Sequence, residues 1–197
     1  MLISFDTSLP VLSVAIIDDG KPLGSLILES AGSRNEKLLP AVDWLLSEVG
    51  RSLDDLAAII VTRGPGSFTG VRIGLATAQG LAFSRGIELV AISTHEAVAP
   101  ASGSSVVFGD AGRGEVYRTR FADGAPLDLP DLVPRESVEE EAIDVVEVCR
   151  LRNVALEAAL RVSGSGGPGR QAWSDATPIY VRPSAAEEKL RKSLEGK

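Results

Sequence analysis

A chain of 197 residues, 44% of them hydrophobic, is long enough for one large domain or two small lobes with an ordinary core. Its net charge of −7 argues against a protein that holds nucleic acid by itself, because an acidic surface gains nothing by neutralising phosphates. A single cysteine, Cys149, excludes an intrachain disulfide, and no apolar run reaches the ~18 residues of a membrane span. Asp6 falls too early for a signal peptide, so we expect a cytoplasmic protein.

The first half of the chain predicts a mixed sheet, in which three antiparallel strands precede helix-linked parallel ones. Strands are expected at 1–5, 11–17, 22–29, 57–62 and 87–92, and helices at about 34–49, 69–83 and 94–100. Pro40 lies inside the first helical pattern, so that helix either kinks there or begins nearer Leu39.

A glycine-rich loop leads into the second predicted helix. Gly64-Pro65-Gly66 breaks the preceding strand, and the hydroxyls of Ser67 and Thr69 can cap the helix that follows. Small residues at 70, 74, 78 and 82 share one stripe of this helix. The stripe allows close packing either on the chain's own sheet or against a second molecule. A phosphate site is a third possibility, although the segment matches neither nucleotide-binding fingerprint.

The second half predicts a further lobe. The small residues of 101–105 mark the boundary, which gives lobes at 1–102 and 103–197, and Val106 to Asp110 echoes Leu2 to Asp6. The remaining expected elements are a strand at 115–121, a helix over 136–149 with a possible strand at 145–148, a helix at 153–161, a flexible loop at 163–169, an extended piece at 179–183 and a terminal helix at 184–197.

Candidate chemical groups are few. His95 is the sole histidine, which rules out a two-histidine metal site within the chain, and a surface or capping role is expected for it. Cys149 is expected to be a small apolar filler. Asp6 and Thr7 at the end of the first strand, with Asp110 in the matching place of the second lobe, could face a magnesium–nucleotide complex, or they could simply cap turns.

Several motifs together resemble the TsaB (YeaZ) family. The resemblance covers the first ~120 residues closely, and the Gly-Pro-Gly-Ser-Phe-Thr-Gly run at 64–70 is specific to that family. The motifs are Phe5-Asp6-Thr7-Ser8, Glu36-Lys37-Leu38-Leu39-Pro40, the run from Arg63 to Gly74, Ser93-Thr94, Asp110-Ala111, Gly114-Glu115-Val116-Tyr117 and Tyr180-Val181-Arg182-Pro183.

The resemblance implies an α/β fold of two ribonuclease-H-like lobes of the actin/Hsp70/sugar-kinase superfamily. It also implies a role in making N6-threonylcarbamoyladenosine at position 37 of ANN-decoding tRNAs, as a non-catalytic subunit that binds and activates the transferase TsaD. The resemblance further implies that the ATPase TsaE joins the complex, that ATP or ADP with magnesium is bound by these partners or at the subunit interface, and that tRNA is contacted only indirectly. Homodimers are expected when TsaD is missing.

We therefore predict that the small-residue helix and the helix before it form the partner interface. The residues expected there are Leu38, Val42, Leu45, Gly70, Val71, Gly74, Leu75, Ala78, Leu81 and Ala82. The alternative is an ATP- and magnesium-dependent hydrolase or phosphotransferase that uses Asp6, Thr7 and Asp110.

Overall fold

The computed structural model describes residues 1–29, 34–139, 141–164 and 176–181. Its first sheet has the strand order β3-β2-β1-β4-β5. These strands are β1 (Leu2–Asp6), β2 (Val11–Asp18), β3 (Lys21–Glu29), β4 (Ala58–Thr62) and β5 (Glu88–Ile92). β1 pairs antiparallel with β2 and parallel with β4, so the mixed sheet predicted from the sequence is confirmed.

The second sheet repeats the centre of the first. Its order is β10-β6-β7-β8, with β9 also paired to β7. The strands are β6 (Ser104–Gly112), β7 (Glu115–Ala122), β8 (Ala125–Pro126), β9 (Asp131–Pro134) and β10 (Ile143–Asp144). β6 pairs antiparallel with β7 and parallel with β10, which are the relations that β1 has with its neighbours. The similarity between 2–6 and 106–110 therefore marks equivalent strands.

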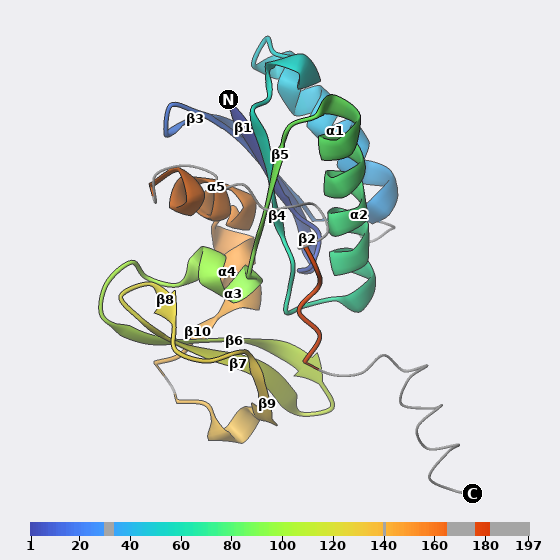
Figure 1. Ribbon diagram of the computed structural model, residues 1–197. Helices are drawn as coiled ribbons and strands as arrows, with labels where there is room; N and C mark the ends of the chain where they lie inside the picture. Colours follow the sequence, from blue (N-terminus) through green and yellow to red (C-terminus); the bar gives the residue numbers. More distant parts are fainter. Residues whose placement is uncertain (30–33, 140, 165–175, 182–197) are drawn as a thin grey trace, which may run out of the picture.

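The helices form two layers around the first sheet (Figure 1). α1 (Arg34–Glu48) and α2 (Phe68–Arg85) cover one face, side by side. α3 (Thr94–Val98), α4 (Val145–Leu151) and α5 (Val154–Gly164) lie between the other face and the second sheet. β1, β2 and β4 are buried on both faces, which explains their nearly continuous apolar sequences.

Local sequence explains the bounds of the two outer helices. The Ser67 side chain accepts a hydrogen bond from the Gly70 backbone N–H and caps α2, which ends at Gly86 in the left-handed conformation. α1 begins at Arg34 and continues through Pro40, so it does not begin near Leu39.

The prediction for 136–149 was largely wrong. A short 3-10 turn, η2 (Arg135–Ser137), is followed by β10, and the possible strand at 145–148 lies instead within α4. Asp144 explains this difference, because its carboxylate accepts a hydrogen bond from the Val146 backbone N–H, 2.8 Å away, and caps α4.

The sequence boundary at 102/103 separates the two sheets but not the helices. α5 comes late in the chain, yet it packs on β1 and β2 of the first sheet. At its start, the Asn153 side-chain amide donates to the backbone carbonyls of Val14 and Leu26, at 3.1 and 2.8 Å. The chain thus crosses to the second sheet and returns to the first.

Two further expectations concern parts outside the described residues. The predicted terminal helix at 184–197 lies there, as does most of the loop predicted at 163–169. Among the residues that the structure describes, no helix has the length and apolar character needed to cross a membrane.

Candidate functional site

Asp6 is the last residue of β1 and is fully buried. Its Oδ2 accepts hydrogen bonds from the hydroxyls of Ser8, at 2.7 Å, and Thr62, while Oδ1 accepts from the Leu9 backbone N–H at 3.2 Å. Ser8 also contacts the hydroxyl of Thr94 in α3, at 3.0 Å. Burial raises the pKa of Asp6, against these hydrogen bonds, which lower it.

Thr7 contacts the N-terminal half of α2. Its hydroxyl donates to the Gly70 backbone carbonyl at 2.6 Å. A side chain at Gly70 would overlap the Thr7 carbonyl oxygen, and a Cβ at Gly74 would lie 2.5 Å from Thr7 Oγ1. The two glycines are therefore needed to bring the helix onto the chain's own first strand.

Asp110, unlike Asp6 and Thr7, is not enclosed. It is exposed on β6, where its carboxylate accepts a hydrogen bond from the Gly112 backbone N–H at 3.0 Å and caps the turn to β7. Asp6 and Thr7 do not fit a magnesium–nucleotide complex, because both are fully enclosed and Asp6 already accepts three hydrogen bonds. Within the described residues, no three metal-ligating side chains come together.

The surface or capping role predicted for His95 is wrong. It is fully buried in α3, and its Nδ1 lies 2.9 Å from the Thr119 hydroxyl on β7. Its Nε2 has no hydrogen-bond partner among the described residues. Burial lowers the pKa of His95 to about 3, so the ring is neutral near pH 7 and joins the lobes without charge.

Cys149 is buried, as expected for an apolar filler. Burial raises the pKa of its thiol to about 11, which leaves it protonated and a poor nucleophile near neutral pH.

The inner stripe of α2, formed by Gly70, Gly74, Ala78 and Ala82, is buried against the chain's own sheet. Buried in the same core are Leu38, Val42, Leu45, Val71 and Leu75, and Leu81 packs against it. This corrects the prediction that these residues face a partner. The sequence indicated that the stripe of α2 packs closely, but it did not show against which surface. The deciding contact is with Thr7, which is far away in the chain.

What the helical layer exposes is a different set of residues. Leu39 and Trp44 of α1 are 48% and 56% exposed, and Phe83 of α2 is 69% exposed. The outer face of α2 consists of Thr69, Arg72, Ala76, Gly80 and Phe83. A Cβ at Gly80 would meet nothing within 4 Å, so this face has room for another chain.

An apolar groove lies between α1 and the edge strand β3. Its volume is about 460 Å³. The groove is lined by Leu26, Leu28, Glu36, Lys37, Pro40, Ala41 and Trp44. Trp44 belongs to both features, so exposed apolar surface continues from the helical layer to the sheet edge.

Two lobes whose central strands, β1 and β6, each pair antiparallel with one neighbour and parallel with another define a protein of the actin/Hsp70/sugar-kinase fold. A family model described as "TsaD: tRNA N6-adenosine threonylcarbamoyltransferase" matches residues 29–129. The chain belongs to the TsaB (YeaZ) family of proteins related to that transferase.

Three comparisons carry this assignment. The chain is 37% identical to the tRNA threonylcarbamoyladenosine biosynthesis protein TsaB of Escherichia coli over 180 residues, which cover 88% of this chain and 74% of that protein. It is 36% identical to TsaB of Bacillus subtilis over 70% of this chain and 61% of that one. The structure of YeaZ from Pseudomonas aeruginosa superposes with a TM-score of 0.73 at 26% identity, over 91% of this chain and 98% of that one.

Proposed function

We propose that this protein is a non-catalytic subunit of the cytoplasmic complex that adds threonylcarbamoyl to N6 of adenosine 37 in ANN-decoding tRNAs. It acts by binding and activating the TsaD transferase. The observation that carries this proposal is the exposed apolar side chains of α1 and α2, Leu39, Trp44 and Phe83, on a fold whose buried Asp6 is already hydrogen-bonded within the chain.

The match to the transferase family supports a paired arrangement of related subunits. Residues 29–129 of this chain, which align with that family, include α1 and α2. A transferase with the same fold has an equivalent helical layer, and two such layers can pack in a pseudo-twofold contact. In the absence of the transferase, the same face would pair two copies of this chain.

We assign the binding of nucleotide and magnesium to the partner proteins. Asp6 and Thr7 are engaged within the chain, so we propose that ATP or ADP with magnesium is bound by TsaD and the TsaE ATPase. The net charge of −7 supports indirect contact with tRNA, through a more basic subunit.

Reconstitution tests the function directly. TsaD and TsaE homologues from the same organism, supplied with tRNA, ATP and a preformed adenylate of threonylcarbamate as the activated donor, should form threonylcarbamoyladenosine only when this chain is added. Equal modification without the chain would contradict the proposal.

Variants of the outer face test the surface. Trp44→Ala and Gly80→Leu should weaken TsaD binding at least tenfold without unfolding the chain, since both positions are exposed. Leu129→Ala is the matched control, because Leu129 is a large apolar residue, 84% exposed, on the second lobe. Loss of binding in that control, or none in the two variants, would point to another surface.

The alternative enzyme is tested on the isolated chain. Titration calorimetry with magnesium and ATP should give no binding heat, because the carboxylate that would face the metal is enclosed. Micromolar affinity with phosphate release would favour a hydrolase that opens to expose Asp6.

A further inference from the structure

The only described residues after Gly164 form an extended segment, 176–181, which we call the strap. It lies along α2 (Figure 1). Its first residue, Ala176, is buried in the core beneath the outer helices. In its middle, the Ile179 backbone N–H donates to the Arg63 carbonyl at 2.8 Å.

Side chains of α2 hold the strap at both ends. The Gln79 side-chain amide donates to the Ala176 carbonyl at 3.2 Å, and Arg72 Nε donates to the Tyr180 hydroxyl at 2.8 Å. Gln79 and Arg72 are two helical turns apart, about 10 Å, on one flank of the helix. The strap therefore runs antiparallel to α2.

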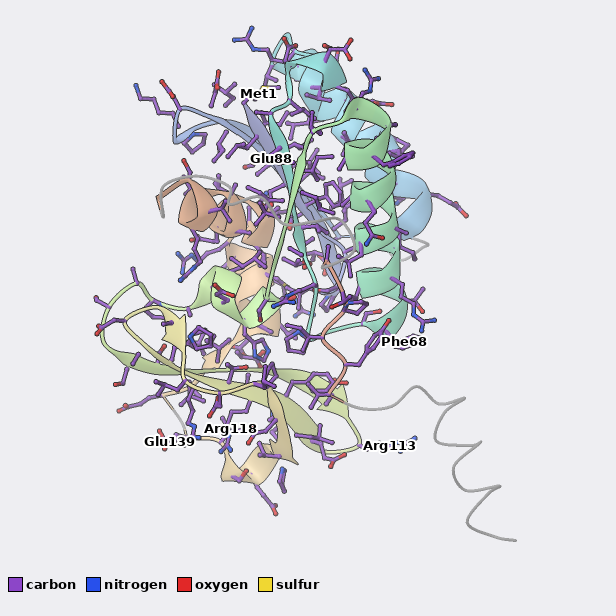
Figure 2. The ribbon with its side chains drawn as sticks, in the orientation of Figure 1. Met1, Phe68, Glu88, Arg113, Arg118 and Glu139 are labelled. Atoms are coloured by element: carbon purple, nitrogen blue, oxygen red, sulfur yellow. The ribbon has the colours of Figure 1, made fainter. Side chains whose placement is uncertain are left out.

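The Tyr180 end is an ordered aromatic cluster at the surface. The Tyr180 and Phe68 rings are 5.0 Å apart, and the Arg72 guanidinium lies 3.9 Å from the Phe68 ring centre. Figure 2 shows Phe68 at the first turn of α2, beside the strap. Tyr180 is still 45% exposed, so an aromatic edge remains available to another molecule.

The strap and α1 lie on opposite sides of α2 (Figure 1). The exposed residues Ala76 and Gly80 of the outer face lie between these two flanks. A chain that seats on the outer face therefore meets α1 on one side and the strap on the other.

We propose that the strap is the second wall of the partner-binding surface and that the Phe68–Arg72–Tyr180 cluster anchors the transferase subunit there. The inference rests on the proposed function and extends it, since α1 and α2 then account for only part of the contact. Tyrosine and arginine held in place before binding lose little conformational freedom when a partner arrives.

Hydrogen exchange of the unmodified protein gives the first test. In the isolated chain, the Ile179 amide is held by one hydrogen bond near the surface. Addition of a saturating TsaD homologue should slow exchange across 176–181 at least tenfold, whereas the exposed turn at 122–125 of the second lobe should not change. Unchanged exchange of the strap in a formed complex would overturn the inference.

Tyrosine variants give the second test. Tyr180→Ala should weaken TsaD binding about tenfold, and Tyr180→Phe, which keeps the ring and loses the bond to Arg72, about threefold. Tyr117→Phe, at the other tyrosine of the chain, is the control and should bind as the wild type does. Wild-type affinity in both Tyr180 variants, checked as folded by circular dichroism, would overturn the role of the strap and leave the proposed function intact. Absence of any complex with the wild type would overturn both.

Discussion

Glycine has opposite effects at two positions of α2, and this difference gives a matched pair of substitutions. Gly70→Ala would place a methyl group against the Thr7 backbone, which cannot move cheaply, so we expect a loss of about 2 kcal/mol or more. Gly80→Ala meets open space and should stabilise the helix by about 0.8 to 1 kcal/mol. Urea unfolding of both variants measures the difference, and equal effects would contradict the packing of the inner stripe.

His95 gives the chain an acid sensitivity whose sign follows from its burial. The folded state lowers the pKa of His95 from 6.5 to about 3, so the unfolded chain binds one more proton between these values. Its contribution to stability is complete above pH 6.5 and falls by about 1.4 kcal/mol per pH unit as pH drops toward 3.

The comparison of His95→Gln with the wild type isolates this effect. Chemical unfolding between pH 7.5 and 5 should show that the free energy of unfolding falls less steeply with decreasing pH in the variant. Near pH 5 the two slopes should differ by about 1.4 kcal/mol per pH unit, the value for one proton. Asp6 also titrates in acid, with a raised pKa that acts in the opposite direction, but it is present in both proteins and cancels in the difference. Parallel curves would mean that water reaches the ring.

At the scale of the element, α1 carries an internal destabilising residue. Pro40 lies inside the helix and is exposed, where it lacks the backbone N–H that would bond one turn back. Pro40→Ala should raise the free energy of unfolding by about 1 to 3 kcal/mol. Lys37→Ala, an exposed substitution in the same helix, should change stability by less than about 0.5 kcal/mol. A loss of stability in Pro40→Ala would indicate that the proline ring contributes packing in the groove.

At the scale of the whole molecule, α5 joins the two lobes through one side chain. Arg161 donates to the Gly124 carbonyl at 3.0 Å and to the Ala99 carbonyl, which fixes a turn of the second lobe to the helix behind the first sheet. Arg161→Met should cost about 2 kcal/mol, because two charge-assisted hydrogen bonds are lost while the apolar stem is kept. Arg150→Met, at an exposed position of α4, is the control. No cost in Arg161→Met would show that these two hydrogen bonds contribute nothing to holding the lobes together.

On the outer surface of the second sheet, arginine side chains form ion pairs with aspartates of the same chain. Arg118 bonds to Asp131 across β7 and β9, at 2.5 and 3.1 Å, and Figure 2 shows Arg118 on the side away from the helices. Arg120 pairs similarly with Asp128. These guanidinium groups are matched within the sheet, which agrees with the proposal that tRNA is recognised by another subunit.

The sequence by itself determined the five strands of the first sheet, the two central strands of the second and the family. Apolar runs, turn residues and the Gly64–Gly70 run act locally, so they can be read without knowing what lies across the fold. The equivalence of 2–6 and 106–110 was visible for the same reason, since each stretch is a short strand that ends in aspartate.

Only the tertiary structure decided which face of α2 is buried, where His95 lies and what the strap contacts. In each case the deciding atom is far away in the chain: Thr7 for Gly70, Thr119 for His95 and Arg72 for Tyr180. A pattern of small or polar residues indicates that a close contact exists. Which face is buried depends on the distant residue that packs against it. For α2 the inner side packs on the chain's own first strand, and the outer side is exposed.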